Sequence, residues 1–217
     1  MSGIQSWIAG KLDDKYNVYL QGEQGLRIER PGAPTAHVYC IEPDEAALFD
    51  VEDLEAALTE MPQADFFVIV RRAVAHQAYE RAEQLGVCLD TFGELQSALF
   101  SDYDIRSHRS KNNAYLQNRL RRSKYVESIT RRGGAAYEIT RVDSLRPLII
   151  VTIDHYELTA DGVYTVLDDY DHLVVDIIVT TNPYAMGFSR ESWRVAERAG
   201  IEVDTLNNFL DRIGEIS

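Results

Sequence analysis

An internal repeat constrains the fold of this chain more than any other feature. The segment Ala82–Leu95 aligns without a gap with Ala196–Phe209, 114 positions later, and five of the 14 pairs are identical. Four further pairs exchange one apolar residue for another, such as Val87 for Ile201. A repeat near half the length of a 217-residue chain indicates that one structural unit occurs twice.

The first half of the chain reads as alternating helices and strands. Ile4, Ile8 and Leu12 recur at helical spacing. The stretch "DFFVIV" (65–70) is short, β-branched and aromatic, which is typical of a strand buried on both faces. Gly86 suits the end of a helix, where a left-handed residue is favoured. The predicted elements are a helix at 3–15, strands at 17–21, 26–30 and 36–42, a helix at 51–58, a strand at 65–70, a helix at 74–85, a strand at 87–90 and a helix at 92–100.

The second half is predicted to repeat this order, starting with a long helix over 113–131. Leu116, Leu120, Val126 and Ile129 supply the apolar face of that helix, and a pair of glycines follows it. The remaining predicted elements are strands at 135–142 and 146–153, a helix at 160–168, a strand at 173–181, a helix at 190–199, a strand at 201–204 and a helix at 205–213.

We therefore expect an α/β protein made of two tandem, similar domains, each a mixed central sheet flanked by helices. The buried strands of the two halves align as Phe67 with Ile177. The polar stretch "SDYDIRSHRSKN" (101–112) separates the halves. This boundary places the domains at 1–104 and 112–217.

Charge is distributed unevenly along the chain. The net charge of −13 argues against nucleic-acid binding over the whole surface. Residues 106–132, however, hold nine lysines or arginines and one acid, a net charge of +8, so the rest of the chain carries −21. Arginines bind phosphate oxygens in pairs of hydrogen bonds, and counterion release drives such binding. The candidate phosphate-binding residues, placed on or beside the predicted helix, are Arg119, Arg121, Arg122, Lys124, Arg131 and Arg132.

Two aromatic residues and one alternative accompany the basic segment. Tyr115 and Tyr125 lie among the cations and would stack on exposed bases. The alternative is a basic face that docks on this protein's own acidic surface or on an acidic protein partner. The sequence leaves both interpretations of residues 106–132 open.

The repeated unit resembles a known group of nucleases. "FVIVRRAVAHQAYERAEQLGVCLDTFGEL" and "IIVTTNPYAMGFSRESWRVAERAGIEVDTLNNFL" both read as a buried strand, a loop, a helix ending at glycine, a short strand and a final helix. This order, with the elements upstream, is similar to restriction-endonuclease-like domains of the Mrr-type and wider PD-(D/E)XK group. The resemblance implies a fold built for phosphodiester chemistry, and a fused duplication would reproduce the two-fold dimers in which such nucleases work.

The chemistry of that group requires residues that neither half shows. The group carries a carboxylate on one central strand and Glu-x-Lys on the next, which together hold a divalent metal and orient the attacking water. The corresponding strands here contain "HVYCIEP" and "LIIVTIDH", without lysine. The nearest acid pairs are Glu29 with Glu42 and Asp143 with Asp154. We expect both copies to be inactive and without a cofactor; the alternative is a magnesium-dependent nuclease that uses these displaced carboxylates.

The cysteines and the hydropathy of the sequence indicate the compartment in which the protein is expected to work. The two cysteines, Cys40 and Cys88, lie in apolar runs and read as buried thiols, which fits a reducing cytoplasmic compartment. No run of 18 apolar residues occurs, so we expect no membrane partner. The expected role is a nucleic-acid-binding or scaffold subunit, as a homo-oligomer or in a larger defence or DNA-processing assembly.

Overall fold

The chain forms two compact units. The computed structural model describes residues 3–182, 184–185 and 187–216. Contacts divide the chain into Met1–Ser110, here called unit 1, and Lys111–Ser217, called unit 2. Among the described residues, no helix has the length and apolar character needed to cross a membrane.

Residues 105–110 pack against unit 1, beyond the boundary expected at 104. Arg106 forms an ion pair with Asp65. The guanidinium of Arg109 donates from Nη2 to both carboxylate oxygens of Glu83, at 2.9 Å each. These contacts tie the polar segment between the repeats to the first of them.

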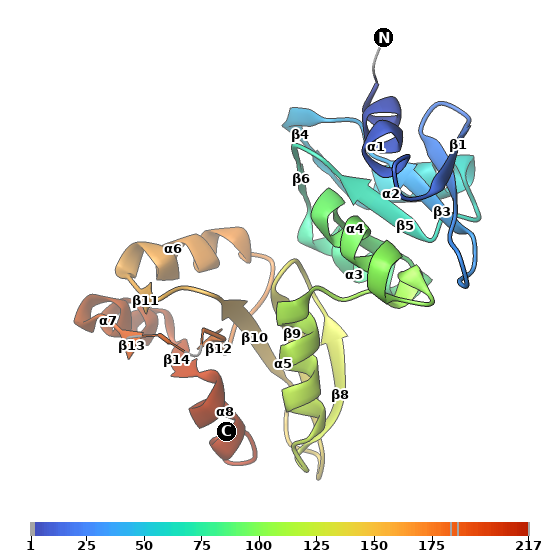
Figure 1. Ribbon diagram of the computed structural model, residues 1–217. Coiled ribbons are helices and arrows are strands. Elements are labelled where there is room, and N and C mark those ends of the chain that lie inside the picture. Colours follow the sequence, from blue (N-terminus) through green and yellow to red (C-terminus); the bar gives the residue numbers. More distant parts are fainter. Residues whose placement is uncertain (1–2, 183, 186, 217) are drawn as a thin grey trace. The chain divides into compact units, whose positions relative to one another are not determined.

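Unit 1 is built from the elements that the periodicity predicts, with two short strands added (Figure 1). In chain order they are α1 (Ile4–Leu12), β1 (Asn17–Gln21), β2 (Gly25–Glu29), β3 (Ala36–Cys40), β4 (Asp44–Phe49), α2 (Val51–Glu60), β5 (Phe66–Ile69), β6 (Arg72–Val74), α3 (His76–Leu85), β7 (Cys88–Thr91), α4 (Phe92–Ser101) and the 3-10 turn η1 (Ile105–Ser107).

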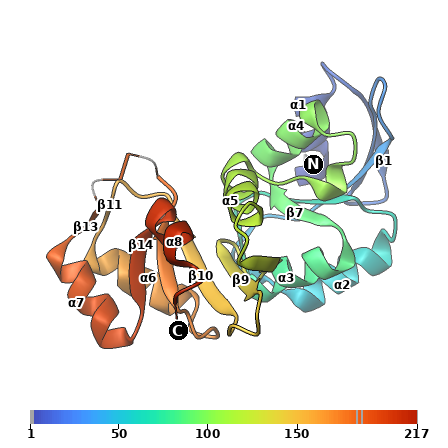
Figure 2. The same ribbon diagram turned by 90° about the horizontal axis from the view of Figure 1, so that it is seen from below.

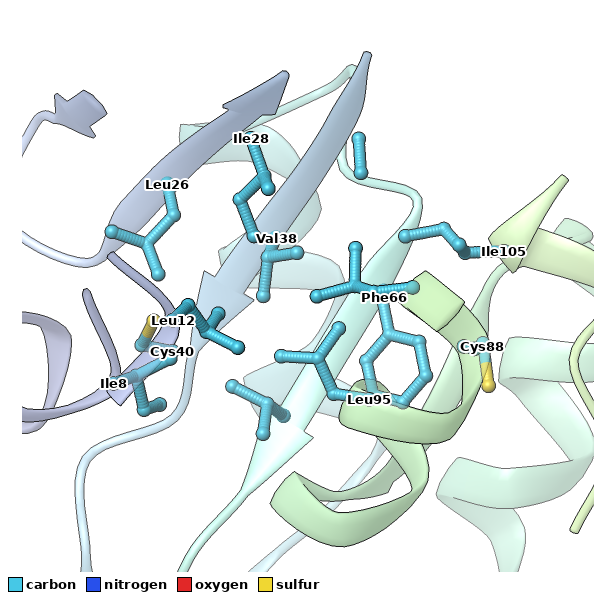
Figure 3. Close-up of a cluster of buried hydrophobic side chains, with 14 of the residues drawn as sticks. Ile8, Leu12, Leu26, Ile28, Val38, Cys40, Phe66, Cys88, Leu95 and Ile105 are labelled. Atoms are coloured by element: carbon cyan, nitrogen blue, oxygen red, sulfur yellow. The ribbon is translucent and has the colours of Figure 1, made fainter. Parts of the chain in front are cut away.

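The sheet of unit 1 lies between two helical layers. Its order is β1-β2-β3-β5-β7, with β1, β2 and β3 antiparallel and β3, β5 and β7 parallel. Helices α1 and α4 cover one face, and α2 and α3 cover the other (Figure 2). Figure 3 shows the first of the two cores, where Leu12 of α1 and Leu95 of α4 face Val38 and Phe66 of the sheet. Both faces of the central strands are therefore buried, as their continuous apolar runs require.

Unit 2 repeats this set of elements. In chain order they are α5 (Lys111–Arg121), β8 (Val126–Arg131), β9 (Ala136–Arg141), β10 (Leu148–Ile153), β11 (Glu157–Leu158), α6 (Ala160–Asp169), β12 (Ile177–Thr180), β13 (Gly187–Phe188), α7 (Arg190–Ala199), β14 (Glu202–Thr205) and α8 (Leu206–Arg212).

The topology of unit 2 matches that of unit 1 strand for strand. The order β8-β9-β10-β12-β14 has β8, β9 and β10 antiparallel and β10, β12 and β14 parallel. Helices α5 and α8 share one core with the sheet, and α6 and α7 share the other. Each unit also has a short parallel ladder outside its sheet, β4 with β6 and β11 with β13. The expected fold class, two tandem α/β units each with a mixed five-stranded sheet, is confirmed.

The expected helix over 113–131 is wrong. Helix α5 stops at Arg121, and residues Val126–Arg131 form β8, an edge strand that pairs with β9. The ladder shifts register between Val126 and Ser128, so Val126 and Ile129 both lie against the core although they are three residues apart. A bulge of this kind imitates helical spacing in the sequence. Strand β8 is thus the counterpart of β1, and both units have three antiparallel strands.

The identical residues of the repeat end one helix and start the next. Gly86 and Gly200 lie in the left-handed region, with φ of 67° and 72°, after α3 and α7. Glycine takes this conformation without steric cost. Thr91 and Thr205 then cap α4 and α8, where each hydroxyl accepts a backbone N–H three residues on, at 3.4 and 3.3 Å. The repeat in the sequence thus encodes a repeated turn and cap.

A buried arginine holds the last helix of unit 1 to its sheet. Arg30 follows β2 and is 7% exposed. Its Nε donates to the carbonyl of Pro34 at 3.0 Å. Its Nη1 and Nη2 donate to the carbonyls of Asp102 and Tyr103, just beyond α4, at 2.7 and 2.8 Å. These carbonyls have no partner within the helix, so the arginine supplies their hydrogen bonds.

Unit 2 has the same arrangement around Arg141, at the end of β9. This side chain is 2% exposed and its Nε donates to the carbonyl of Arg146 at 2.9 Å. Its Nη1 donates to the carbonyls of Ile213 and Ile216, beyond α8, at 2.7 and 2.8 Å. Because Arg30 and Arg141 make matching bonds at matching places, the repeat extends well outside the segment in which the sequence shows it.

A pair of aspartates shows which residues of the two repeated sheets correspond to each other. Asp65 precedes β5 and accepts the N–H of His37 at 2.8 Å. Asp176 precedes β12 and accepts the N–H of Ile149 at 2.7 Å. Each carboxylate also forms an ion pair with an arginine, Arg106 in unit 1 and Arg146 in unit 2.

This alignment corrects the expected match of the buried strands by one residue. Phe66, next to Asp65, pairs with Cys88, and Ile177, next to Asp176, pairs with Glu202. Phe66 therefore corresponds to Ile177, where the sequence comparison placed Phe67. A slip of one residue exchanges the two faces of a strand. The sequence could not exclude the slip because both faces of these strands are apolar.

Candidate nucleic-acid interface

The basic surface of unit 2 starts at the C-terminal end of α5. Leu116 and Leu120 of α5 are buried in the core beneath the helix, at 1% and 0% exposure, which turns the other residues outward. Arg119 and Arg121 lie in the last turn. Cations there interact favourably with the partial negative charge of a helix C-terminus. The cluster defined by Arg119, Arg121, Arg122 and Lys124 is called the α5 cluster below.

Arg119 is the most firmly held member of the α5 cluster. Its Nη1 donates to the hydroxyl of Tyr115 at 2.8 Å, and its guanidinium carbon lies 5.7 Å from the centre of that ring. Its Nη2 donates to Oδ1 of Asn207, on α8, at 2.9 Å. Neutral partners orient this guanidinium and leave its charge uncompensated.

The other three members are exposed. Arg121 donates to Oε1 of Gln117 at 2.9 Å, and the ammonium of Lys124 lies 4.8 Å from the centre of the Tyr125 ring. Within the described part of unit 2, no member of the α5 cluster is paired with a carboxylate. Elsewhere in the chain, carboxylates pair with Arg27, Arg72, Arg81, Arg106, Arg109, Arg132, Arg146, Arg194 and Arg212.

Arg131 and Arg132 are separated from the α5 cluster. They lie at the far end of β8, whose six residues span about 20 Å at roughly 3.3 Å per residue. Arg131 donates to the carbonyls of Gly133 and Gly134 at 2.9 and 3.1 Å. Arg132 lies 3.5 Å from the carboxylate of Glu138. The six expected cations therefore do not share one helix; two of them stabilise the β8–β9 turn.

The equivalent helix end in unit 1 lacks this positive charge, because two aspartates balance two lysines there. The stretch "KLDDKY" (11–16) spans the C-terminal end of α1, and "RLRRSKY" (119–125) spans the C-terminal end of α5. The leucines of both stretches are buried, and both tyrosines pack against the helix-side core. Asp13 and Asp14 thus stand where Arg121 and Arg122 stand in unit 2. The helical spacing of residues 113–131 concealed this second repeat in the sequence.

The first pair of candidate metal ligands lies at opposite ends of its hairpin. Glu29 ends β2, whereas Glu42 follows the end of the antiparallel strand β3. The ladder pairs Gly25 with Tyr39, so the two carboxylates are about seven residues apart along the hairpin, roughly 23 Å at 3.3 Å per residue. Ligands of one magnesium or calcium ion lie about 2.0–2.6 Å from it. Glu29 and Glu42 of one unit cannot hold the same ion.

Asp143 and Asp154 are arranged in the same way in unit 2. Asp143 lies in the turn after β9 with a positive φ of 58°, and Asp154 follows the far end of β10. The carboxylate of Asp154 accepts a hydrogen bond from Asn112 at 3.3 Å. The two aspartates are separated by the length of the hairpin and share no site within the unit.

The central strands also lack the residues of a nuclease centre. Strands β3 (AHVYC) and β10 (LIIVTI) contain neither an acid nor a lysine. Within residues 3–182, 184–185 and 187–216, no three histidine, cysteine, aspartate or glutamate side chains form a group that could hold a metal ion. The acids that directly precede the buried strands β5 and β12, Asp65 and Asp176, take part in structural contacts.

Comparison of the chain with protein-family models, curated proteins and solved structures finds no match.

Proposed function

We propose that this protein binds nucleic acid through the α5 cluster and acts as a binding or scaffold subunit. The observation that carries the proposal is the absence of carboxylate partners around four neighbouring cations in the described part of unit 2. Most arginines outside the cluster are neutralised by ion pairs or buried against carbonyl groups. A cluster that the protein leaves uncompensated is suited to phosphate groups, which bind arginine with two parallel hydrogen bonds.

The architecture is consistent with a duplicated, inactive nuclease of the restriction-endonuclease-like group. Each unit has three antiparallel strands, a helix, a parallel strand, a helix, a further parallel strand and a last helix after the opening helix, as the resemblance implies. The central strands lack the Glu-x-Lys pair in both units. A fold that positions a phosphodiester without cutting it would serve as a binding module.

The side chains around the cluster favour contacts to the backbone and to unpaired bases. Phosphate contacts orient a ligand but carry no sequence information. Tyr115 is 46% exposed beside Arg119, and Tyr125 lies beneath Lys124. Tyrosine rings stack on bases of any kind. The proposal therefore predicts weak sequence preference and better binding of single strands than of blunt duplexes.

Fluorescence anisotropy with a labelled single-stranded oligonucleotide tests this proposal. Charge reversal of Arg121 and Arg122 to glutamate should weaken binding at least about tenfold at low salt. The matched control reverses Arg190 and Arg198, which are exposed on α7 of the same unit. If the control variant weakens binding as much as the cluster variant does, the α5 cluster is not the interface.

Two further outcomes identify the alternatives. Cleavage of plasmid or single-stranded DNA with magnesium or manganese, abolished by Asp154→Ala, would show an active nuclease. Absence of any binding to DNA or RNA below about 100 mM salt, where phosphate contacts are strongest, would point to an acidic protein partner.

A further inference from the structure

Unit 1 presents an aromatic surface at the ends of α1 and α4. Phe100 is 88% exposed and Tyr103 is 71% exposed, both near the end of α4. Hollows of about 380 and 330 Å³ lie beside Phe100, and Tyr16 borders both. Single exposed apolar residues are common, but aromatic residues grouped around hollows mark interaction sites. This surface, defined by Tyr16, Phe100 and Tyr103, is called the aromatic surface below.

Acidic residues adjoin the aromatic surface. Asp13 and Asp14 line a third hollow of about 460 Å³, which Tyr16 also borders. Among the described residues, neither aspartate forms an ion pair. Glu29, Lys15 and Arg30 line the same hollow, so three carboxylates face two cations there. A partner for this surface would combine positive charge with groups that pack on aromatic rings.

The α5 cluster has the required chemistry. Guanidinium groups both pair with carboxylates and stack on aromatic faces, and this is why arginine is favoured at interfaces. Arg121 and Arg122 stand in unit 2 where Asp13 and Asp14 stand in unit 1. We propose that two copies of this chain associate, with the α5 cluster of each copy docked on the aromatic surface of the other.

With one surface of each kind per chain, the smallest closed form of this association is a two-fold dimer. In a two-fold dimer each contact between copies occurs twice, so both basic and both acidic surfaces are used. The contact occupies the cations that the proposed function assigns to phosphate. Nucleic acid and the second copy would therefore compete, and added oligonucleotide would shift dimer to monomer.

Sedimentation velocity over a range of protein concentrations tests the association. Wild-type protein should dimerise, with a dissociation constant that rises with salt. Reversal of Asp13 and Asp14 to arginine makes both surfaces basic, and reversal of Arg121 and Arg122 to aspartate cancels the net positive charge of the α5 cluster and places two carboxylates opposite Asp13 and Asp14. Each variant alone should raise the dissociation constant by about 100-fold, because like charges face each other across both contacts. The equimolar mixture of the two variants should form a heterodimer as tight as the wild-type dimer.

The mixture distinguishes association between copies from a contact inside one chain. A contact within one chain would be lost in each variant and would not return on mixing. A wild-type protein that stays monomeric at all concentrations, or a mixture that does not associate, would overturn the proposal.

Two measurements separate this inference from the proposed function. The variant with Asp13 and Asp14 reversed should still bind oligonucleotide, because its α5 cluster is unchanged; loss of dimerisation alone leaves the proposed function intact. Phe100→Ala should also weaken the dimer, whereas Tyr164→Ala, at an exposed aromatic residue of α6, should not. Equal effects of these two substitutions would exclude the aromatic surface as the contact.

Discussion

Replacement of Arg141 by methionine tests the contact that closes unit 2. Methionine keeps most of the apolar length of the side chain and removes its donors. Three carbonyls, those of Arg146, Ile213 and Ile216, then lose hydrogen bonds of 2.7–2.9 Å from a side chain that is 2% exposed. Two of these carbonyls lie just beyond α8, so the C-terminal end of that helix should loosen first.

The size of the effect follows from the number and kind of bonds. Hydrogen bonds from a charged donor contribute about 1.5–3 kcal/mol each. Burial opposes this, since it lowers the pKa of Arg141 and so disfavours the charged form. We expect a net loss of about 3–4 kcal/mol in the free energy of unfolding of unit 2, a large part of the roughly 5–15 kcal/mol typical of a domain.

Urea denaturation gives the free energy, and hydrogen exchange locates the change. Amide protection should fall in α8 (Leu206–Arg212) and at the end of β9. Arg146→Met is the matched control, because that side chain is half exposed and its ion pair with Asp176 should contribute less than about 1 kcal/mol. If Arg141→Met costs no more than the control, or if α8 keeps its protection, the arginine does not hold the helix.

Three further predictions concern single positions. Gly200→Ala should destabilise unit 2 by about 1 kcal/mol, because the backbone φ of 72° disfavours a residue with a Cβ atom. Gly10→Ala should stabilise unit 1 by a similar amount, because Gly10 lies inside α1, where alanine is the better helix former and a Cβ atom meets no neighbour. Thermal unfolding of the two variants measures both effects. Asp176→Ala should cost about 2–3 kcal/mol in urea titrations, since a backbone N–H and an arginine lose their acceptor. Cys40 and Cys88 are buried, so both thiols should resist thiol reagents at pH 8 until the protein unfolds. Burial raises the pKa of Cys40 to about 12, so the free energy of unfolding should fall above about pH 8.5, where only the thiol of the unfolded chain ionises.

The fold could be predicted because the same constraint occurs twice. Gly86 and Gly200 end a helix in the same conformation, and Thr91 and Thr205 begin the next one. The strands between them are short, apolar and β-branched, which identifies buried parallel strands. Local chemistry of this kind is independent of distant contacts, and it is therefore readable from the sequence.

The features that the sequence concealed depend on contacts far along the chain. The bulge at Val126 gives β8 the spacing of a helix, and only pairing with β9 distinguishes the two. The short strands β11 and β13 hold two residues each, too few for any periodicity. The matching roles of Arg30 and Arg141 involve carbonyls about 72 positions away.

The candidate site was predicted in part. The basic composition of residues 106–132 identified the α5 cluster, but composition cannot show which cations are already engaged. Arg106 and Arg109 belong to ion pairs of unit 1, and Arg131 and Arg132 to the β8–β9 turn. The contrast with Asp13 and Asp14 required the alignment that the fold provides.

The salt dependence of oligonucleotide binding tests the central claim most directly. If the four cations of the α5 cluster contact phosphates of a single strand, the logarithm of the association constant should fall with the logarithm of salt concentration with a slope of about −3. Reversal of Arg121 and Arg122 should reduce the slope to about −1.5. A wild-type slope near zero, or a slope that the reversal leaves unchanged, would contradict the assignment of this cluster to nucleic acid.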